Sequence, residues 1–179
     1  FSKWQGAGND FVIVNGLREK VDGLDWAAAG VKVCDRHFGV GADGLVFVLP
    51  SDEADFAMRI INSDGSEAEM CGNVTRCVAR YVYEQGLTDK TKITLATLAG
   101  LIKPELVFAG GKITGVRVDM GKPRLTRGEI PMTGNAGDTA MDVAVEAGGR
   151  IYRGVGVSMG NPHFVIFVED VSAVALPVI

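Results

Sequence analysis

Cysteine, histidine and long apolar runs are scarce in this sequence. It has three cysteines and two histidines among 179 residues. An odd, low cysteine count argues against a disulfide framework and favours a reducing, cytoplasmic compartment. No apolar run approaches the ~20 residues that a membrane-spanning helix needs. The formal net charge is −4 and no block of basic residues occurs, so we expect neither a membrane nor a nucleic acid as partner.

Glycine, in contrast, is abundant, with 24 residues that separate short β-rich segments. Apolar runs between turn signals predict strands at 11–15, 45–49, 56–62, 92–98, 101–108, 112–120, 141–146, 150–158 and 163–169. Gly110 and Gly111 predict a hairpin turn. One helix is expected at 25–37, with Asp25 as its N-cap and Gly39 just past its end. The patterns place a boundary near residue 120, giving domains 1–120 and 121–179, the second of which looks incomplete.

A second helix is expected between Asn73 and Gly86, because apolar residues there recur on one helical face. These residues are Val74, Cys77, Val78, Tyr81 and Val82. Arg80 and Glu84 fall outside this stripe at a spacing that favours an ion pair. Cys77 lies on the stripe and is therefore expected in the core, as is Cys34 in the first helix.

Cys71 stands where this second helix begins. Unpaired N–H groups and the positive end of the helix dipole favour the thiolate of a cysteine at that position. Gly72 allows close approach of a ligand, Asn73 adds a short polar side chain, and the same N–H groups would bind a carboxylate. The alternative is that Cys71 packs as a small apolar residue beside a simple turn. The spacing alone favours neither interpretation.

Other motifs carry weaker signals. Six residues of helix rotate Cys77 about 240° away from Cys71, so the two are not expected to share a metal ion. Residues 6–11 do not form a dinucleotide-binding loop, because no strand is predicted before them and the third glycine is absent. Asn9 could face a ligand or cap a turn. His163 could be a core histidine, and His37 is expected to lie at the C-terminus of the first helix.

Four segments, taken together and in this order, resemble the diaminopimelate epimerase family. They are "KWQGAGNDF" at 3–11, "RHFGVGADG" at 36–44, "NSDGSEAEMCGNVTRC" at 62–77 and "SMGNPH" at 158–163. The resemblance implies an α+β fold of two pseudo-symmetric lobes, each a mixed β-sheet wrapped around a central helix, with the second lobe only partly present. It also implies a cytoplasmic isomerase of lysine and peptidoglycan-precursor biosynthesis, which interconverts LL- and meso-diaminopimelate.

The resemblance also assigns roles to individual residues. It implies that Cys71 is one of two acid/base cysteines and that His163 supports catalysis. Substrate-binding roles fall to Asn9, Asn62, Gly72, Asn73 and Asn161. Neither a cofactor nor a metal is implied, the substrate is the small molecule diaminopimelate, and a homodimer is plausible from the family alone.

Three departures from the family pattern are visible. Val74 replaces a glycine in the first turn of the second helix, and Gly44 stands where some members carry a substrate-binding glutamine. The second cysteine and a distal Glu-Arg pair lie, in the family, beyond residue 179. We therefore expect the 179-residue chain alone to be inactive.

Two other functions stay open at this point. A proline-racemase-like enzyme of the same fold is one, although such enzymes usually carry histidine where this chain has Asn73. The other is a non-catalytic binding domain in which Cys71 is only structural.

Overall fold

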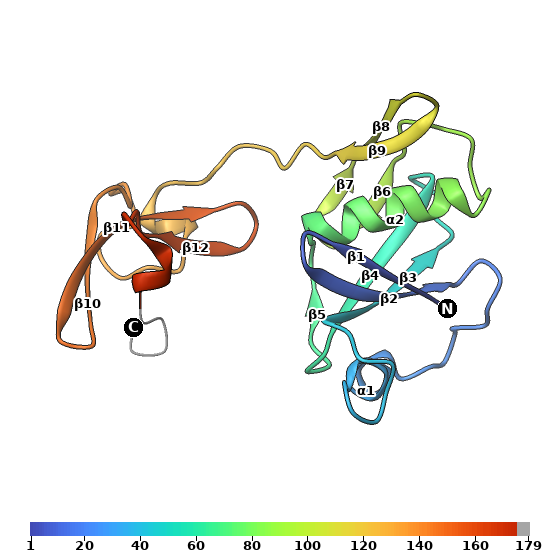
Figure 1. Ribbon diagram of the computed structural model, residues 1–179, viewed down its shortest axis with the longest axis horizontal. Coiled ribbons are helices and arrows are strands. Elements are labelled where there is room, and N and C mark those ends of the chain that lie inside the picture. The colour runs from blue at the N-terminus through green and yellow to red at the C-terminus, as the bar shows by residue number, and fades with distance from the viewer. Residues whose placement is uncertain (175–179) are drawn as a thin grey trace. The chain divides into compact units, whose positions relative to one another are not determined.

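The structure is a computed structural model that describes residues 1–174 (Figure 1). Its contacts divide the chain into two compact units, one of Phe1–Asp119 and one that begins at Met120. The first unit holds both α-helices and most of the strands, whereas the second is built mainly of strands. The α+β fold class is confirmed.

A seven-stranded mixed sheet forms the first unit. Its strands are β1 (Ser2–Gly6), β2 (Asn9–Asn15), β3 (Gly44–Leu49), β4 (Phe56–Asn62), β5 (Glu67–Ala68), β6 (Leu95–Thr97) and β7 (Gly100–Ile102). They are ordered β1-β2-β3-β4-β6-β7, with β5 paired to β4. The β2–β3 and β4–β6 pairs are parallel and the others antiparallel. A separate hairpin consists of β8 (Glu105–Ala109) and β9 (Lys112–Arg117).

The sheet is covered on both faces, by a different helix on each. Along β3, Val46 and Val48 pack toward α2 (Gly72–Glu84), whereas Leu45 and Phe47 pack in the cluster that contains the end of α1 (Trp26–Cys34). Successive side chains of a strand point to opposite faces. Both faces of β3 are therefore apolar, which explains its uninterrupted apolar sequence.

The helix α2 lies against β1, β2, β8 and β9 (Figure 1). The five apolar residues of its predicted stripe are all buried, so that prediction is confirmed. Thr75 and Ala79 are buried as well, because the strands cover more of the helix than the stripe required. The exposed side holds Arg80 and Glu84, whose side chains pair at 2.7 Å as expected.

The first helix is shorter than predicted. It begins as expected, with the Asp25 side chain accepting a hydrogen bond from the amide of Ala28. It ends at Cys34 instead of His37, because the Asp35 carboxylate accepts the backbone N–H groups of His37 and Phe38, each at 2.7 Å. Such a local bond competes with helix continuation. His37 is thus outside the helix, and its predicted place at the helix C-terminus is wrong.

The sequence also concealed a strand. Residues 2–6 form β1, which pairs with β2 through a two-residue turn at Ala7 and Gly8. Both turn residues have positive φ, 52° and 93°, as tight hairpins between twisted strands require. The prediction that no strand precedes this glycine-rich segment is wrong, and β2 begins at Asn9 rather than Phe11.

Three further strands differ from their predicted bounds. The expected strand at 101–108 is split into β7 and β8 around Lys103 and Pro104, because proline cannot donate to a ladder. The strand expected at 92–98 is reduced to β6, and the one at 112–120 ends at Arg117. The Gly110–Gly111 turn is confirmed, with φ of 56° and 75°.

The second unit contains one antiparallel sheet of β10 (Val143–Ala147), β11 (Arg150–Ser158) and β12 (Pro162–Val165). Two short 3-10 helices, η1 (Arg127–Glu129) and η2 (Val171–Ala173), lie outside the sheet. Its buried apolar cluster is small: Ile130, Ala140 and Val143, with Met132 packed against them. The strands predicted at 141–146 and 163–169 are present with shifted ends. In the described part of the chain, no helix is long and apolar enough to cross a membrane.

Candidate functional site

Cys71 is the N-cap of α2. Its backbone is extended, with φ −146° and ψ 118°, and its carbonyl accepts the amide of Thr75 at 2.9 Å. Its side chain makes no capping hydrogen bond. The thiol is half-buried, unlike the buried thiols of Cys34 and Cys77. Cys71 is therefore the residue at which α2 begins, where unpaired N–H groups and the helix dipole favour negative charge. Its partly buried side chain also packs against the apolar cluster around α2.

Two asparagines predicted as substrate contacts meet beside this helix start. The Nδ2 of Asn73 donates to Oδ1 of Asn9 at 2.6 Å, although the two residues are 64 positions apart. Close packing of β1 on α2 makes this contact possible. A Cβ added to Gly6 would lie 3.1 Å from the Asn73 carbonyl oxygen and 3.1 Å from the Cys77 sulfur. Asn9 thus bonds another side chain and does not cap a backbone turn.

A group of charged residues next to Asn9, which the sequence analysis did not predict, forms hydrogen bonds and ion pairs around it. The Asp43 Oδ2 atom accepts from the Asn9 amide and from the backbone N–H of Asp10, both at 3.0 Å. Arg36 binds Asp10 with both terminal nitrogens, at 3.1 and 2.8 Å, and also reaches Asp43 at 2.8 Å. Lys3 adds a fourth charge, 3.1 Å from Asp10. The only sequence signal was that these charges fall in two of the resembling segments.

Asn62 and Gly44 lie in register where β4 ends and β3 begins. The Asn62 side chain donates to the Ser66 hydroxyl at 3.0 Å, and the next residue, Ser63, donates its amide to the Asp43 carbonyl at 3.2 Å. Asn62 is thus connected to the Asp43 loop, but no direct bond joins it to Asn9 or Asn73 among the hydrogen bonds that the structure records. A Cβ at Gly44 would lie 3.2 Å from the Ile61 carbonyl oxygen, so this strand start is closely packed.

Asn161 and His163 belong to the second unit. Asn161 lies in the turn after β11, where its carbonyl accepts the amide of Met159 at 3.2 Å. His163 is on β12, opposite Val157 of β11. The side chains of Asn161 and His163 are both exposed. His163 is therefore not a core histidine within this unit. The contacts described within each unit bring neither residue to Cys71.

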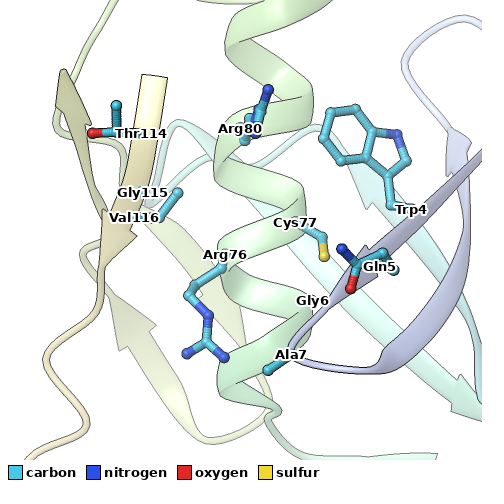
Figure 2. Close-up of a pocket in the computed structure, with 10 residues that line it drawn as sticks. All are labelled: Trp4, Gln5, Gly6, Ala7, Arg76, Cys77, Arg80, Thr114, Gly115 and Val116. Carbon is cyan, nitrogen blue, oxygen red and sulfur yellow. The ribbon is translucent and has the colours of Figure 1, made fainter. Parts of the chain in front are cut away.

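The first unit has a cavity of about 310 Å³ (Figure 2). It is enclosed by β1 and its turn, by α2 and by β9, with lining residues Trp4, Gln5, Gly6, Ala7, Arg76, Cys77, Arg80, Thr114, Gly115 and Val116. Arg76 joins it to the site, because its guanidinium extends toward the start of α2 and donates to Oδ1 of Asn73. Neither Cys71 nor the two asparagines line this cavity. Among residues 1–174, no group of three metal-ligating side chains comes together.

The three cysteines differ in environment, and this difference can be measured by alkylation. Burial raises the pKa of Cys77 to about 11 and also raises the pKa of Cys34. Because only the thiolate reacts, we expect iodoacetamide at pH 8 to label Cys71 at least ~10-fold faster than either. Peptide mass mapping over time reads this directly, and unfolded protein should label evenly. Equal rates in the native chain would contradict the assigned environments.

Acid should weaken the charged group around Asp10. Hydrogen bonds from Arg36 hold the pKa of Asp10 well below its usual range. The stability from this carboxylate is therefore complete above about pH 4, the value of an unfolded aspartate, and is lost as pH falls toward the folded value.

We expect Asp10→Asn to remove about 1 kcal/mol of the decrease in unfolding free energy between pH 5 and 2, allowing for the exposure of Arg36. Urea denaturation across this range measures it. Asp22→Asn, at an exposed loop position, is the matched control. If both variants kept the full wild-type acid dependence, the Asp10 interaction would contribute nothing.

Comparison with known proteins places the chain in a family. Residues 1–126 match the family model described as diaminopimelate epimerase. The chain belongs to the diaminopimelate epimerase family. It is 56% identical over 174 residues to the diaminopimelate epimerase of Pelotomaculum thermopropionicum, which covers 97% of this chain and 62% of that protein. The corresponding protein of Moorella thermoacetica is 56% identical over 172 residues, 96% of this chain and 61% of its own length.

The chain thus spans about three-fifths of these curated relatives, whose sequences extend further than its own. Solved structures agree on the fold. A hydroxyproline epimerase from Agrobacterium vitis superimposes with a TM-score of 0.65 over 92% of this chain and 50% of that chain, at 18% identity. A PhzF-family phenazine biosynthesis protein from Bacillus anthracis gives 0.52 over 70% and 40%, at 26% identity. At 18% identity the hydroxyproline epimerase shows a shared fold only, and its substrate is not inferred for this chain.

The structure shows the surroundings of Val74 and Gly44, the two positions where the sequence analysis found departures from the family pattern. Val74 is fully buried in the core beneath the sheet, so the extra side chain is accommodated by packing against apolar neighbours. Gly44 is also buried, at the start of β3. Val74 keeps its backbone N–H, so the first turn of α2 loses no donor at this position.

Proposed function

We propose that the complete protein carrying this chain interconverts LL- and meso-diaminopimelate without a cofactor, with Cys71 as one of its two acid/base cysteines. The observation that carries the proposal is the position of Cys71. It is a half-buried thiol with no capping partner, at the N-terminus of a 13-residue helix and followed by Gly72 and Asn73. Family membership supplies the substrate class.

Inversion at an α-carbon requires a base on one face and an acid on the other. In one direction Cys71 donates its proton to the carbon, and in the reverse direction its thiolate removes it. The second cysteine, which the family resemblance locates outside these 179 residues, performs the opposite task. Negative charge develops between the two on the α-carbon and its carboxylate, and no net oxidation occurs.

The first turn of α2 can stabilise that charge. Backbone N–H groups at a helix start, including those near Gly72 and Asn73, bind a carboxylate and act most strongly where charge grows. The amides of Asn9 and Asn73 are bonded to each other close to this turn. Asn62 is the last residue of β4, in register with Gly44 at the start of β3. Gly72 and Asn73 form the proposed carboxylate seat, and Asn9 and Asn62 are proposed as further substrate contacts.

Asn161 and His163 complete the proposal from the second unit. Both side chains are exposed on or beside β12, which leaves them available to a ligand. Asn161 is proposed to contact substrate and His163 to support proton transfer. The protein is further proposed to act in the cytoplasm. It is also proposed to be a homodimer, and light scattering of the purified complete protein tests this oligomeric state.

A stereochemical assay distinguishes this proposal from a proline-racemase-like activity and from a non-catalytic domain. The complete protein is incubated separately with LL-diaminopimelate, L-proline and trans-4-hydroxy-L-proline, and the stereoisomers are separated by chiral chromatography. Appearance of meso-diaminopimelate alone supports the proposal. Inversion of proline or hydroxyproline instead, or of none of the three, would reject it.

A further inference from the structure

We propose that Asp43 and Arg76 are positioning residues that fix the direction of two side-chain amides at the start of α2. The amides are those of Asn9 and Asn73. Their direction decides which polar atoms remain for a substrate carboxylate. This inference rests on the proposed function and assigns roles to two residues that the motif comparison did not single out.

The four side chains form a continuous row of hydrogen bonds. The Asn9 Nδ2 donates to Asp43 at 3.0 Å, and Asn9 Oδ1 accepts from Asn73 Nδ2 at 2.6 Å. At the far end, Asn73 Oδ1 accepts from the guanidinium of Arg76. Each asparagine therefore uses one donor and one acceptor within what we call the amide row.

The chemistry of its ends gives the amide row a single direction. An ionised carboxylate only accepts hydrogen bonds, and a guanidinium only donates them. If the Asn9 amide turned over, its oxygen would face the carboxylate of Asp43. If the Asn73 amide turned over, its N–H groups would face Arg76. Both reversals replace a charge-assisted bond with a repulsive contact.

Asp43 is itself held in place, so it can act as a fixed reference. Its Oδ2 also accepts the backbone N–H of Asp10 at 3.0 Å, and its Oδ1 accepts from Arg36 at 2.8 Å. Arg36 in turn is anchored on the Asp10 carboxylate. The carboxylate that orients Asn9 is therefore paired on both of its oxygens.

Within residues 1–174, only one bond is recorded for the side-chain N–H groups of Asn73. Its second N–H is proposed to lie open beside the unpaired N–H groups of the first turn of α2. A carboxylate placed there would accept from both sources. In the reversed direction it would meet the amide oxygen instead. The amide row should therefore affect substrate binding more than the chemical step, and loss of direction should raise KM while kcat stays nearly constant.

Either charged end alone can orient the two amides. The test therefore compares the single variants with the double variant. Asp43→Ala leaves Arg76 to orient Asn73, and Arg76→Ala leaves Asp43 to orient Asn9. Because the two amides are bonded to each other, the remaining charged end orients both, and we expect each single variant of the complete protein to leave KM for LL-diaminopimelate within about 1.3-fold of wild type. In the double variant the two amides remain bonded to each other, so they turn over together between two directions. About half of the molecules then present the productive arrangement, so KM rises about twofold.

Asp43→Asn in the Arg76→Ala background is the matched control. An asparagine at 43 keeps an oxygen for Asn9 and for the Asp10 amide but loses the ion pair with Arg36. We expect it to return KM to within about 1.3-fold of Arg76→Ala alone. If Asp43 served only the ion pair, Asp43→Asn and Asp43→Ala would be equally impaired. That result, or additive single effects, would overturn the inference.

A second measurement separates this inference from the proposed function. The ¹⁵N-labelled 179-residue chain should show side-chain amide protons of Asn9 and Asn73 that exchange slowly with water. The protection of Asn9 should decrease in the double variant, which lacks its acceptor Asp43. Absence of epimerisation by the complete wild-type protein would reject the proposed function while this spectrum still supports the amide row. Rapid exchange of both amides in the wild-type chain would reject the amide row whatever the activity.

Discussion

Replacement of Cys71 by serine is expected to lower kcat for diaminopimelate epimerisation by about 10²- to 10⁴-fold, the range that a positioned acid or base contributes. A serine hydroxyl has nearly the same shape, and Cys71 makes no side-chain capping bond that the change could break. The fold and the carboxylate seat should therefore survive, and KM should change little. Chiral chromatography of the complete variant protein measures the loss.

Cys34→Ala is the matched control for removal of a cysteine. Cys34 is 2% exposed, in the cluster that packs beneath the other face of the sheet. Its removal should cost some stability but leave kcat within about twofold, because a buried thiol with a raised pKa is inert at neutral pH. If Cys71→Ser retained near-normal turnover, or if Cys34→Ala lost as much, the assignment of Cys71 would be wrong.

The second large effect concerns stability. Phe47→Ala should reduce the free energy of unfolding by about 3–5 kcal/mol, the usual cost of truncating a fully buried phenylalanine. Phe47 is 1% exposed, and its ring stacks on Trp26 of α1 at 4.7 Å between centroids. The deletion would remove the aromatic contact between β3 and this helix. Urea denaturation of the chain measures it.

Phe38→Ala is the control for the loss of a phenylalanine ring. Phe38 is 95% exposed in the loop between α1 and β3, so its truncation should change the unfolding free energy by less than ~0.5 kcal/mol. Equal effects of the two substitutions would mean that the packing around β3 is not as described. The test matters for function because β3 begins directly after Asp43.

Local patterns predicted the parts of the fold in which side chains repeat regularly. The stripe from Val74 to Val82 identified α2 and the burial of Cys77, because a helix packed on one side by strands must be apolar there. The run at residues 45–49 identified β3 because a strand buried on both faces is apolar at every position. Asp25 identified the start of α1 through its side-chain oxygen.

The remainder depended on contacts that no local pattern contains. Strand β1 was missed because its residues alternate only between half-buried and exposed, and its turn has Ala7 rather than asparagine or aspartate at positive φ. The end of α1 was missed because Asp35 bonds forward to the loop.

The candidate site shows the same division. The position of Cys71 at a helix start followed from the chain itself, and the roles of the asparagines came from resemblance. The amide row could not be foreseen, because Asp43 and Asn73 are 30 residues apart in sequence and are linked only through Asn9. Pairing of distant polar side chains is set by strand register and helix placement, which emerge only when the unit is folded.

The most direct test of the central claim is solvent-isotope incorporation. The complete protein is incubated with LL-diaminopimelate in D₂O, and the products are analysed by chiral chromatography with mass spectrometry. The account predicts meso-diaminopimelate carrying one deuterium at the inverted α-carbon, and almost none with Cys71→Ser. Formation of the meso isomer without deuterium, or at the wild-type rate by the serine variant, would contradict the claim that Cys71 exchanges a proton with that carbon.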